Sequence, residues 1–223
     1  FTTFSFSRAR CTRSAKLLEA QKGRLTVETM TAILRDHGGG EDWRPDKGLA
    51  GSSVTICWHA GMGPLRASQS VGSLVSHLHA DHPTHFATAS SAPCTGIFKP
   101  LWVDVELPDL GPTPKETYDS STYFWRHEAL HRAVLRDYRT FMATYRDERD
   151  VVEKEFIRQA LTCAGQPTSD RKAFMERCFS NGEESENRWL QKILATPQKY
   201  KPTWHFMNAW EKFNHQARMP TLN

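Results

Sequence analysis

The sequence predicts an α+β protein in which short strands come first and helices follow. Between residues 52 and 105 lie four short segments, most of them rich in β-branched or aromatic residues and bounded by Gly, Pro or Asp. From residue 120 onward, apolar residues instead recur at helical spacing. We therefore expect a strand-rich part over residues 1–117 and a helical region over residues 118–223 that packs on it.

The first elements are a strand and a helix. Residues 1–16 are predicted to form an exposed strand and loop, because their three phenylalanines favour a strand over an amphipathic helix. This arginine- and serine-bearing stretch also has the composition of an organelle-targeting sequence, which stays open as an alternative. A helix is predicted over residues 26–37, where the apolar residues from Val27 to Leu34 share one face and Gly38 follows as a stop signal.

Four strands are predicted next, as antiparallel neighbours in a sheet. They cover residues 52–59, 68–78, 84–91 and 97–105. The proline-bearing segment 108–114 then ends the strand-rich part.

Three helices are predicted after this boundary. The first covers residues 120–163, with the charged run from Arg146 to Lys154 as its solvated face. The second follows a Gly-Gln-Pro break, takes Ser169 or Asp170 as its cap and extends to about Leu194. The third covers residues 203–217. Three late aromatic residues are expected to pack in the core, namely Trp189, Trp204 and Trp210.

Composition narrows the classes of function. The 223 residues carry a net charge of +4, and the basic residues are scattered, so nucleic-acid binding is not expected. No apolar run reaches the roughly 20 residues that a membrane-spanning helix needs. The five cysteines form no C-x-x-C pair and leave an odd count, which favours reduced thiols in an intracellular protein. We expect a cytoplasmic location, with an organelle such as the mitochondrion as the alternative.

One short motif has the form of a zinc site. His127-Glu128-Ala129-Leu130-His131 reads as H-E-x-x-H, which on a helix places two imidazoles on one face with a Glu as general base. The flanking residues argue against zinc, because Arg126 and Arg132 place fixed positive charge beside the site.

A third ligand for this motif is also missing. The extended motif needs Gly and His where this chain has Val134 and Asp137. Downstream carboxylates on the same predicted helix, such as Glu153, would lie about 25 Å or more away. We therefore assign no metal ligand and no cofactor, and a zinc metalloprotease working through this motif is only the third functional hypothesis.

Four segments in a fixed order carry a resemblance to a known family. They are TICWH at residues 55–59, SQSVGS at 68–73, SAPCTGIFKP at 91–100 and FWRHEALHR at 124–132. Together with LRDH at residues 34–37, they resemble the C-terminal half of the secernins and their bacterial dipeptidase relatives. The resemblance extends from about Thr26 to about Tyr145.

The resemblance implies an N-terminal-nucleophile hydrolase with an αββα sandwich. In such enzymes a Cys at the mature N-terminus attacks an amide carbonyl, with its own α-amino group as base. Phe1 cannot do this, so this chain would be half of the sandwich followed by a helical C-terminal region, and no catalytic residue is assigned to it.

Two functional hypotheses follow from the resemblance. The first is a secernin-like, thiol-dependent peptide or amide hydrolase that works with another chain supplying the nucleophile. The alternative is a non-catalytic pseudoenzyme that serves as a structural or interaction subunit of a larger assembly. The expected partners are accordingly another protein chain or assembly, and small peptides in the first case.

Several polar residues of the resembling segments are candidates for a site. Candidates for lining a substrate pocket are His59, Gln69, Ser73, Cys94 and Lys99. Candidates for a buried polar network that joins helix to sheet are Arg126, His127 and Glu128. Ordinary structural hydrogen bonding is the alternative for each of them.

Overall fold

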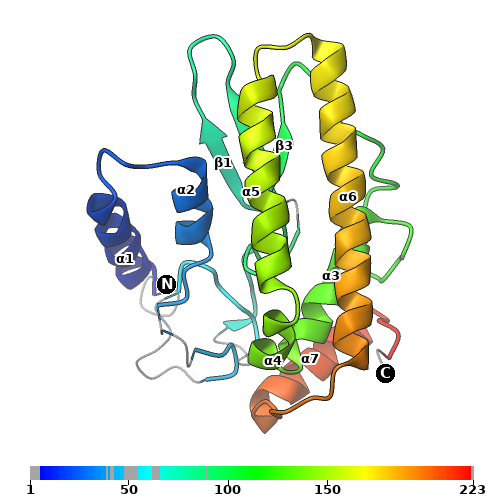
Figure 1. Ribbon diagram of the computed structural model, residues 1–223. Coiled ribbons are helices and arrows are strands. Elements are labelled where there is room, and N and C mark those ends of the chain that lie inside the picture. Colours follow the sequence, from blue (N-terminus) through cyan, green and yellow to red (C-terminus); the bar gives the residue numbers. More distant parts are fainter. Residues whose placement is uncertain are drawn as a thin grey trace.

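The computed structural model describes residues 6–38, 40, 43–47, 55–61, 66–88 and 90–221. Within these ranges a small sheet packs against helices (Figure 1). In chain order the elements are α1 (Ser7–Ala20), α2 (Val27–Leu34), β1 (Leu74–His77), β2 (Thr84–Ala87), β3 (Lys99–Leu101), α3 (Tyr123–Leu135), α4 (Tyr138–Ala143), α5 (Arg146–Cys163), α6 (Thr168–Ala195) and α7 (Trp204–Gln216). The predicted α+β class is confirmed. None of these helices is both long and apolar enough to cross a membrane.

The sheet is an antiparallel meander of order β1-β2-β3. Val75 pairs with Phe86, and Phe86 pairs with Pro100, so one buried side chain from each strand lies in register. Helices α5 and α6 pack against β3, and α5 also packs against β2. In Figure 1 these two long helices run side by side next to the sheet. The described residues contain this one sheet.

Three of the four predicted strands are present in shorter form. The first predicted strand is wrong in its described part, because residues 55–59 form no strand, and residues 52–54 lie outside the described ranges. The backbone N–H groups of Ile56 and Cys57 both donate to the carbonyl of Asp36, at 2.9 and 3.1 Å. Because this loop carbonyl satisfies them, no neighbouring strand is needed.

The N-terminal prediction is wrong for residues 7–16, which belong to α1. Residues 1–5 lie outside the described ranges. Good helix formers fill the segment that follows Arg8, and summed helix propensity outweighs the single aromatic residue, Phe6, that precedes the helix. Helix α1 packs against α2.

The predicted helix over residues 120–163 is in fact three helices. Asp137 interrupts it, since its Oδ1 accepts from the N–H of Thr140 and caps α4, while its Oδ2 accepts from the N–H groups of Lys199 and Tyr200 at 2.8 Å each. A second break at Tyr145 begins α5. The chain therefore folds back, and α5 lies against α6 and α2.

The remaining helices agree with the sequence pattern. Helices α2 and α7 lie where they were predicted, and α6 begins at Thr168 after Pro167, slightly before the predicted caps. Trp189 and Trp210 are buried as expected, but Trp204 is 67% exposed and does not belong to the core.

The charged run at the start of α5 is not wholly solvated, because Glu153 and Arg149 are buried. Glu153 accepts two hydrogen bonds from Arg35, at 2.6 Å each, and one from the N–H of Phe98 at 2.7 Å. Arg35 follows α2, and Phe98 precedes β3. A single carboxylate thus joins α5 to α2 and to the sheet.

Replacing this carboxylate tests its role. We expect Glu153→Gln to lower the free energy of unfolding by about 3 kcal/mol, because it leaves the Arg35 guanidinium buried without a counter-charge. The matched control is Glu155→Gln on the exposed side of the same helix, which should leave stability unchanged. Urea unfolding of the two variants measures the difference, and equal stabilities would show that the buried pair is not a major contributor.

Candidate metal centre

Four side chains of metal-ligand type converge at one point. The ligand atoms of His37, Cys57, His59 and Cys94 all lie within 4.8 Å of one another. His59 Nε2 is 3.2 Å from His37 Nε2, 3.4 Å from Cys57 Sγ and 3.3 Å from Cys94 Sγ. A tetrahedral zinc ion with two nitrogen and two sulfur ligands requires separations of about 3.3–3.8 Å between them. The three distances from His59 Nε2 are close to this range, and the remaining separations, all within 4.8 Å, need only a small adjustment to form a Cys₂His₂ centre.

The loop after α2 positions three of the four ligands. The Asp36 carbonyl, which accepts from Ile56 and Cys57, brings the segment 55–59 alongside His37. Cys57 and His59 are two apart in an irregular segment that brings both side chains to the same point. Trp58 between them is held by Ser70, whose Oγ accepts from the Trp58 N–H at 3.0 Å and whose N–H donates to the Trp58 carbonyl at 2.9 Å.

The fourth ligand, Cys94, lies in a turn that is clamped from several sides. All four carbonyl oxygens of residues 93–96 accept hydrogen bonds from side chains. Arg35 donates to the first and the last of them, at 2.7 and 3.0 Å, and Arg149 donates to the carbonyl of Cys94 itself. The hydroxyl of Tyr145 donates to the third at 3.1 Å. The backbone that carries Cys94 is thereby restrained.

The surroundings of the four ligands are largely buried and aromatic. Cys57, His59 and Cys94 are 0%, 2% and 3% exposed, whereas His37 is half-buried. The ring of Trp43 stacks on the His37 ring with a centroid distance of 3.6 Å. The Tyr138 ring meets both of these rings edge-on. Most sides of these ligand atoms are therefore shielded from solvent.

The two thiols differ in proton affinity. Burial alone raises the pKa of Cys94, but a hydrogen bond from Cys57 and electrostatic interactions with His59 and His37 outweigh burial and hold that pKa well below its ordinary value. Burial and the same hydrogen bond raise the pKa of Cys57 well above its ordinary value. Burial lowers the pKa of His37, so its imidazole is neutral and can act as a ligand. A divalent cation would favour the second thiolate as well.

A solvent-open pocket of about 670 Å³ lies beside this centre. His37 and Cys94 form part of its wall, and Trp43 and Tyr138 form another part. The four ligands therefore have one side that faces a space large enough for a small organic molecule.

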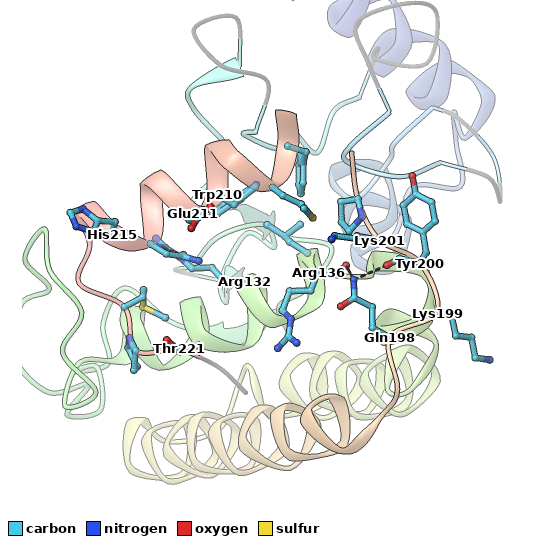
Figure 2. A pocket seen from close by; sticks show the side chains of 17 residues that line it. Arg132, Arg136, Gln198, Lys199, Tyr200, Lys201, Trp210, Glu211, His215 and Thr221 are labelled. Carbon is cyan, nitrogen blue, oxygen red and sulfur yellow. Dashed lines mark hydrogen bonds between the residues drawn. The ribbon is translucent and has the colours of Figure 1, made fainter. Parts of the chain in front are cut away.

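A larger pocket of about 910 Å³ lies between α3, α7 and residues 198–202 (Figure 2). Gln198 closes one side of it by donating to the carbonyls of Arg136 and Tyr200 at 2.8 Å each. None of the four converging ligands lines this pocket. Its size alone does not indicate chemistry, so the smaller pocket is the better candidate for a site.

The structure brings together only some of the predicted pocket residues. His59 and Cys94 belong to the cluster. Gln69 lies outside the cluster. Its Oε1 is 3.2 Å from Nε2 of His131, and Nδ1 of His131 is 2.9 Å from the hydroxyl of Thr95, which follows Cys94. Burial lowers the pKa of His131 to about 3, so this ring is neutral.

Ser73 and Lys99 lie elsewhere. Ser73 extends the pairing of β1 with β2 through two hydrogen bonds with Thr88. Lys99 is 1% exposed, donates to the carbonyl of Ile97 at 3.0 Å and lies 3.9 Å from Glu186. Neither residue is among those that line the pocket beside Cys94.

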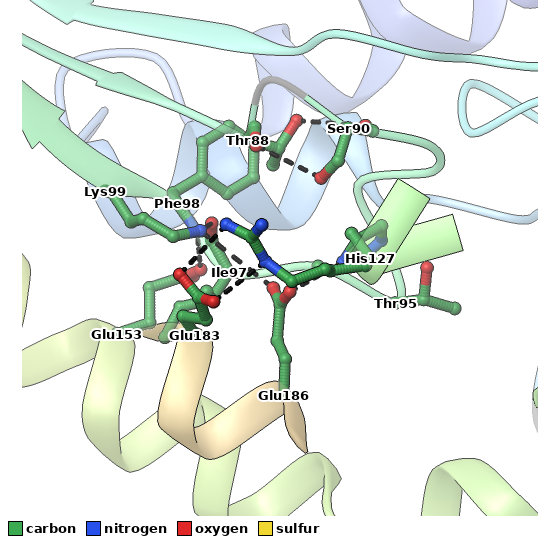
Figure 3. Close-up of polar contacts among 12 residues, drawn as sticks. Thr88, Ser90, Thr95, Ile97, Phe98, Lys99, His127, Glu153, Glu183 and Glu186 are labelled. Atoms are coloured by element: carbon green, nitrogen blue, oxygen red, sulfur yellow. Dashed lines mark hydrogen bonds and ion pairs between the residues drawn. The ribbon is translucent and has the colours of Figure 1, made fainter. Parts of the chain in front are cut away.

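The H-E-x-x-H residues take part in hydrogen bonds. His127 Nε2 contacts the carbonyl of Ser91, and its Nδ1 lies 3.0 Å from Glu186 of α6 (Figure 3). Glu128 pairs with Arg132 at 2.8 Å. Within the described ranges, neither imidazole of this motif joins a group that could hold a metal ion.

The predicted polar network divides into separate contacts. His127 and Glu128 are buried, but Arg126 is half-buried and pairs with Glu183 of α6 at 2.8 Å. Arg126 and His127 therefore join α3 to α6, and Glu128 pairs with the next turn of α3 itself. The three side chains do not form one network. Figure 3 shows Glu183 and Glu186 reaching from α6 toward this region.

Two members of the cluster, His37 and Cys57, were not among the predicted site residues. The only local signal is the Cys57-x-His59 spacing, which is weak without a second nearby pair. His37 and Cys94 come from separate segments, and only folding brings them to this spacing.

Comparisons with known proteins identify no relative, since no family model, no curated protein and no solved structure matches the chain. The resemblance to the secernins therefore stays a prediction.

The pairing of His127 with Glu186 predicts a pH dependence. Burial alone would lower the pKa of His127, but the Glu186 carboxylate outweighs burial and raises it. A raised folded-state pKa gives stability that is present below the ordinary histidine pKa and is lost as pH rises through the folded-state pKa. His127→Gln should therefore cost about 3 kcal/mol near pH 6 and less near pH 9.

Urea unfolding at the two pH values measures this difference. The control is Arg126→Gln on the same helix, whose effect should be the same at both values because Arg does not titrate in this range. If the cost of His127→Gln is also independent of pH, His127 is neutral in the folded protein and the ion pair is not formed.

Proposed function

We propose that this protein binds one Zn²⁺ ion through His37, Cys57, His59 and Cys94, and that the ion is structural. The observation that carries the proposal is the convergence of the four ligand atoms, three of them buried, within 4.8 Å of one another. Two thiolates and two imidazoles form a donor set typical of zinc rather than of Mg²⁺ or Ca²⁺, which prefer oxygen ligands. Four protein ligands leave no open position on the ion, as in structural sites.

The ion would act as a cross-link. It would join the loop after α2, the irregular segment 55–59 and the turn 93–96, which are distant in the sequence. Residues 55–61 have no ladder of backbone hydrogen bonds to hold them, so the ion supplies a constraint that regular structure does not. A closed site of this kind supports the hypothesis of a non-catalytic structural or interaction protein.

Metal content tests the proposal directly. The purified protein should contain about one zinc ion per chain, measured by mass spectrometry of the metal. Cys57→Ser or Cys94→Ser should lose most of this zinc and lower Tm by about 10 °C, since a loss of about 3–4 kcal/mol has this effect in a protein of this size.

The matched control is Cys163→Ser, a half-buried cysteine outside the cluster, which should keep its zinc. Replacement of the ion by Co²⁺ should give the visible absorption of a tetrahedral thiolate complex. A zinc content near zero in protein refolded with excess zinc would contradict the proposal.

A second candidate function is the thiol-dependent peptide hydrolysis that the resemblance to the secernins implies. In that case another chain supplies the N-terminal Cys, and the three-stranded sheet is part of an αββα sandwich that this chain completes. The observation that favours it is the pocket of about 670 Å³ beside Cys94 and His37, because a dipeptide fits into a space of this size.

Native material distinguishes the second candidate from the first. Protein isolated from its own cells should carry a co-purifying chain that begins with Cys, and the complex should hydrolyse dipeptides until a thiol reagent is added. The single chain should be inactive. If no such chain is found and the native material has no dipeptidase activity, this candidate is wrong.

A further inference from the structure

The pocket beside the metal centre has a strongly basic wall. Asp36 is the one acidic residue among the described residues that line it. The arginines of this wall are Arg13, Arg35, Arg139, Arg146 and Arg149. An excess of one sign of charge in a concave site raises the local concentration of ligands of the opposite sign.

Three of these arginines have acidic partners. Arg13 pairs with Asp36, Arg35 with Glu153 and Arg149 with Asp150. Arg146 is different: it is exposed, and within the described part of the chain it has neither an ion pair nor a hydrogen bond. The positive charge of Arg146 is therefore not balanced by these pairs.

The donors that remain for a ligand can be counted. A guanidinium carries five N–H donors. Arg35 uses all three of its nitrogens to hold Glu153 and the turn 93–96, so it is committed to the fold. Arg13 uses only Nε and Nη2 on Asp36. Arg13 and Arg146 thus have more unused donors than Arg35 and Arg149.

These two residues come from different helices. Arg13 lies on α1, and Arg146 is the first residue of α5, while α2 packs against both helices (Figure 1). Both line the same pocket, so an anion within it can be approached from two elements. Bidentate contacts from guanidinium groups suit carboxylates and phosphates equally.

The rest of the wall is apolar and aromatic. Trp43, Tyr138 and Met142 line the pocket, and Trp43 is already fixed by its stacking on His37. We propose that this pocket binds a small organic oxyanion, with its carboxylate or phosphate held by Arg146 and Arg13 and its organic body against Trp43 and Tyr138. A Zn²⁺ ion bound by two thiolates and two neutral imidazoles adds no net charge to this wall, so the excess positive charge of the arginines remains when the ion is bound.

Direct binding tests this proposal on the full chain. Phenyl phosphate and phenylacetate are titrated into the protein at constant ionic strength, with inorganic phosphate and acetate as the probes that lack the organic body. Calorimetry and tryptophan fluorescence report binding. At least one aromatic anion should bind saturably and more tightly than its small counterpart. Binding of phenyl phosphate alone assigns a phosphate group, and binding of phenylacetate alone assigns a carboxylate.

Matched arginine variants locate the site. Arg146→Ala should weaken the binding at least tenfold, since a charge-assisted hydrogen bond contributes about that factor. Arg146→Lys, which keeps the charge but loses the planar donor pair, should be intermediate. Arg158→Ala removes an exposed arginine from the same helix and should leave affinity unchanged.

Circular dichroism and zinc content are measured on every variant. These readouts separate a failure of anion binding from a failure of the zinc proposal. If neither aromatic anion binds saturably, or if Arg146→Ala and Arg158→Ala bind as the wild type does, the proposal is overturned.

Discussion

The buried pair between Arg35 and Glu153 is the interaction on which the rest of the structure depends. Arg35 follows α2, Glu153 lies on α5, and the carboxylate also accepts from the backbone N–H of Phe98 before β3. The same guanidinium donates to two carbonyls of the turn 93–96. Burying a charged pair is costly unless its remaining hydrogen-bonding groups are satisfied, and here the protein satisfies them.

This pair also explains how the proposed metal centre is assembled. It fixes the end of α2, two residues before His37, and it fixes the turn that carries Cys94. The Asp36 carbonyl then holds the segment with Cys57 and His59. Each ligand is therefore positioned by hydrogen bonds of its neighbours, and a metal ion has little left to reorganise. Supporting contacts of this kind raise metal affinity because the ligands need not lose much conformational freedom on binding.

The features that were predicted from the sequence are those that depend on local residue patterns. The α+β class, helices α2, α6 and α7, and the sheet order follow from periodicity and stop signals within a few residues. The breaks near Asp137 and Tyr145 were missed because both residues lie inside a continuing apolar stripe. Asp137 acts there through residues 199 and 200, which no local window includes. Helix α1 was missed because the aromatic residues at the start of the chain received too much weight.

The proposed metal centre also shows the limit of local sequence patterns. H-E-x-x-H is a local pattern, yet its two imidazoles have other partners. His127 contacts the Ser91 carbonyl and pairs with Glu186, and His131 lies within hydrogen-bond distance of Gln69 and Thr95. The four residues that do converge share no short motif. Two of them, His59 and Cys94, were proposed from the family resemblance, but for lining a pocket and not for binding metal.

The metal centre and the basic pocket share parts of their framework. Arg149 donates to the Cys94 carbonyl and also lines the pocket, and Arg35 does the same for two other carbonyls of that turn. These side chains are already immobilised by the fold, so the wall that an anion would meet is largely preorganised. Preorganisation lowers the entropy lost on binding, which leaves more of the interaction energy for affinity. Arg146 is exposed at the start of α5, so its side chain is the part of the wall that would lose conformational freedom when a ligand binds.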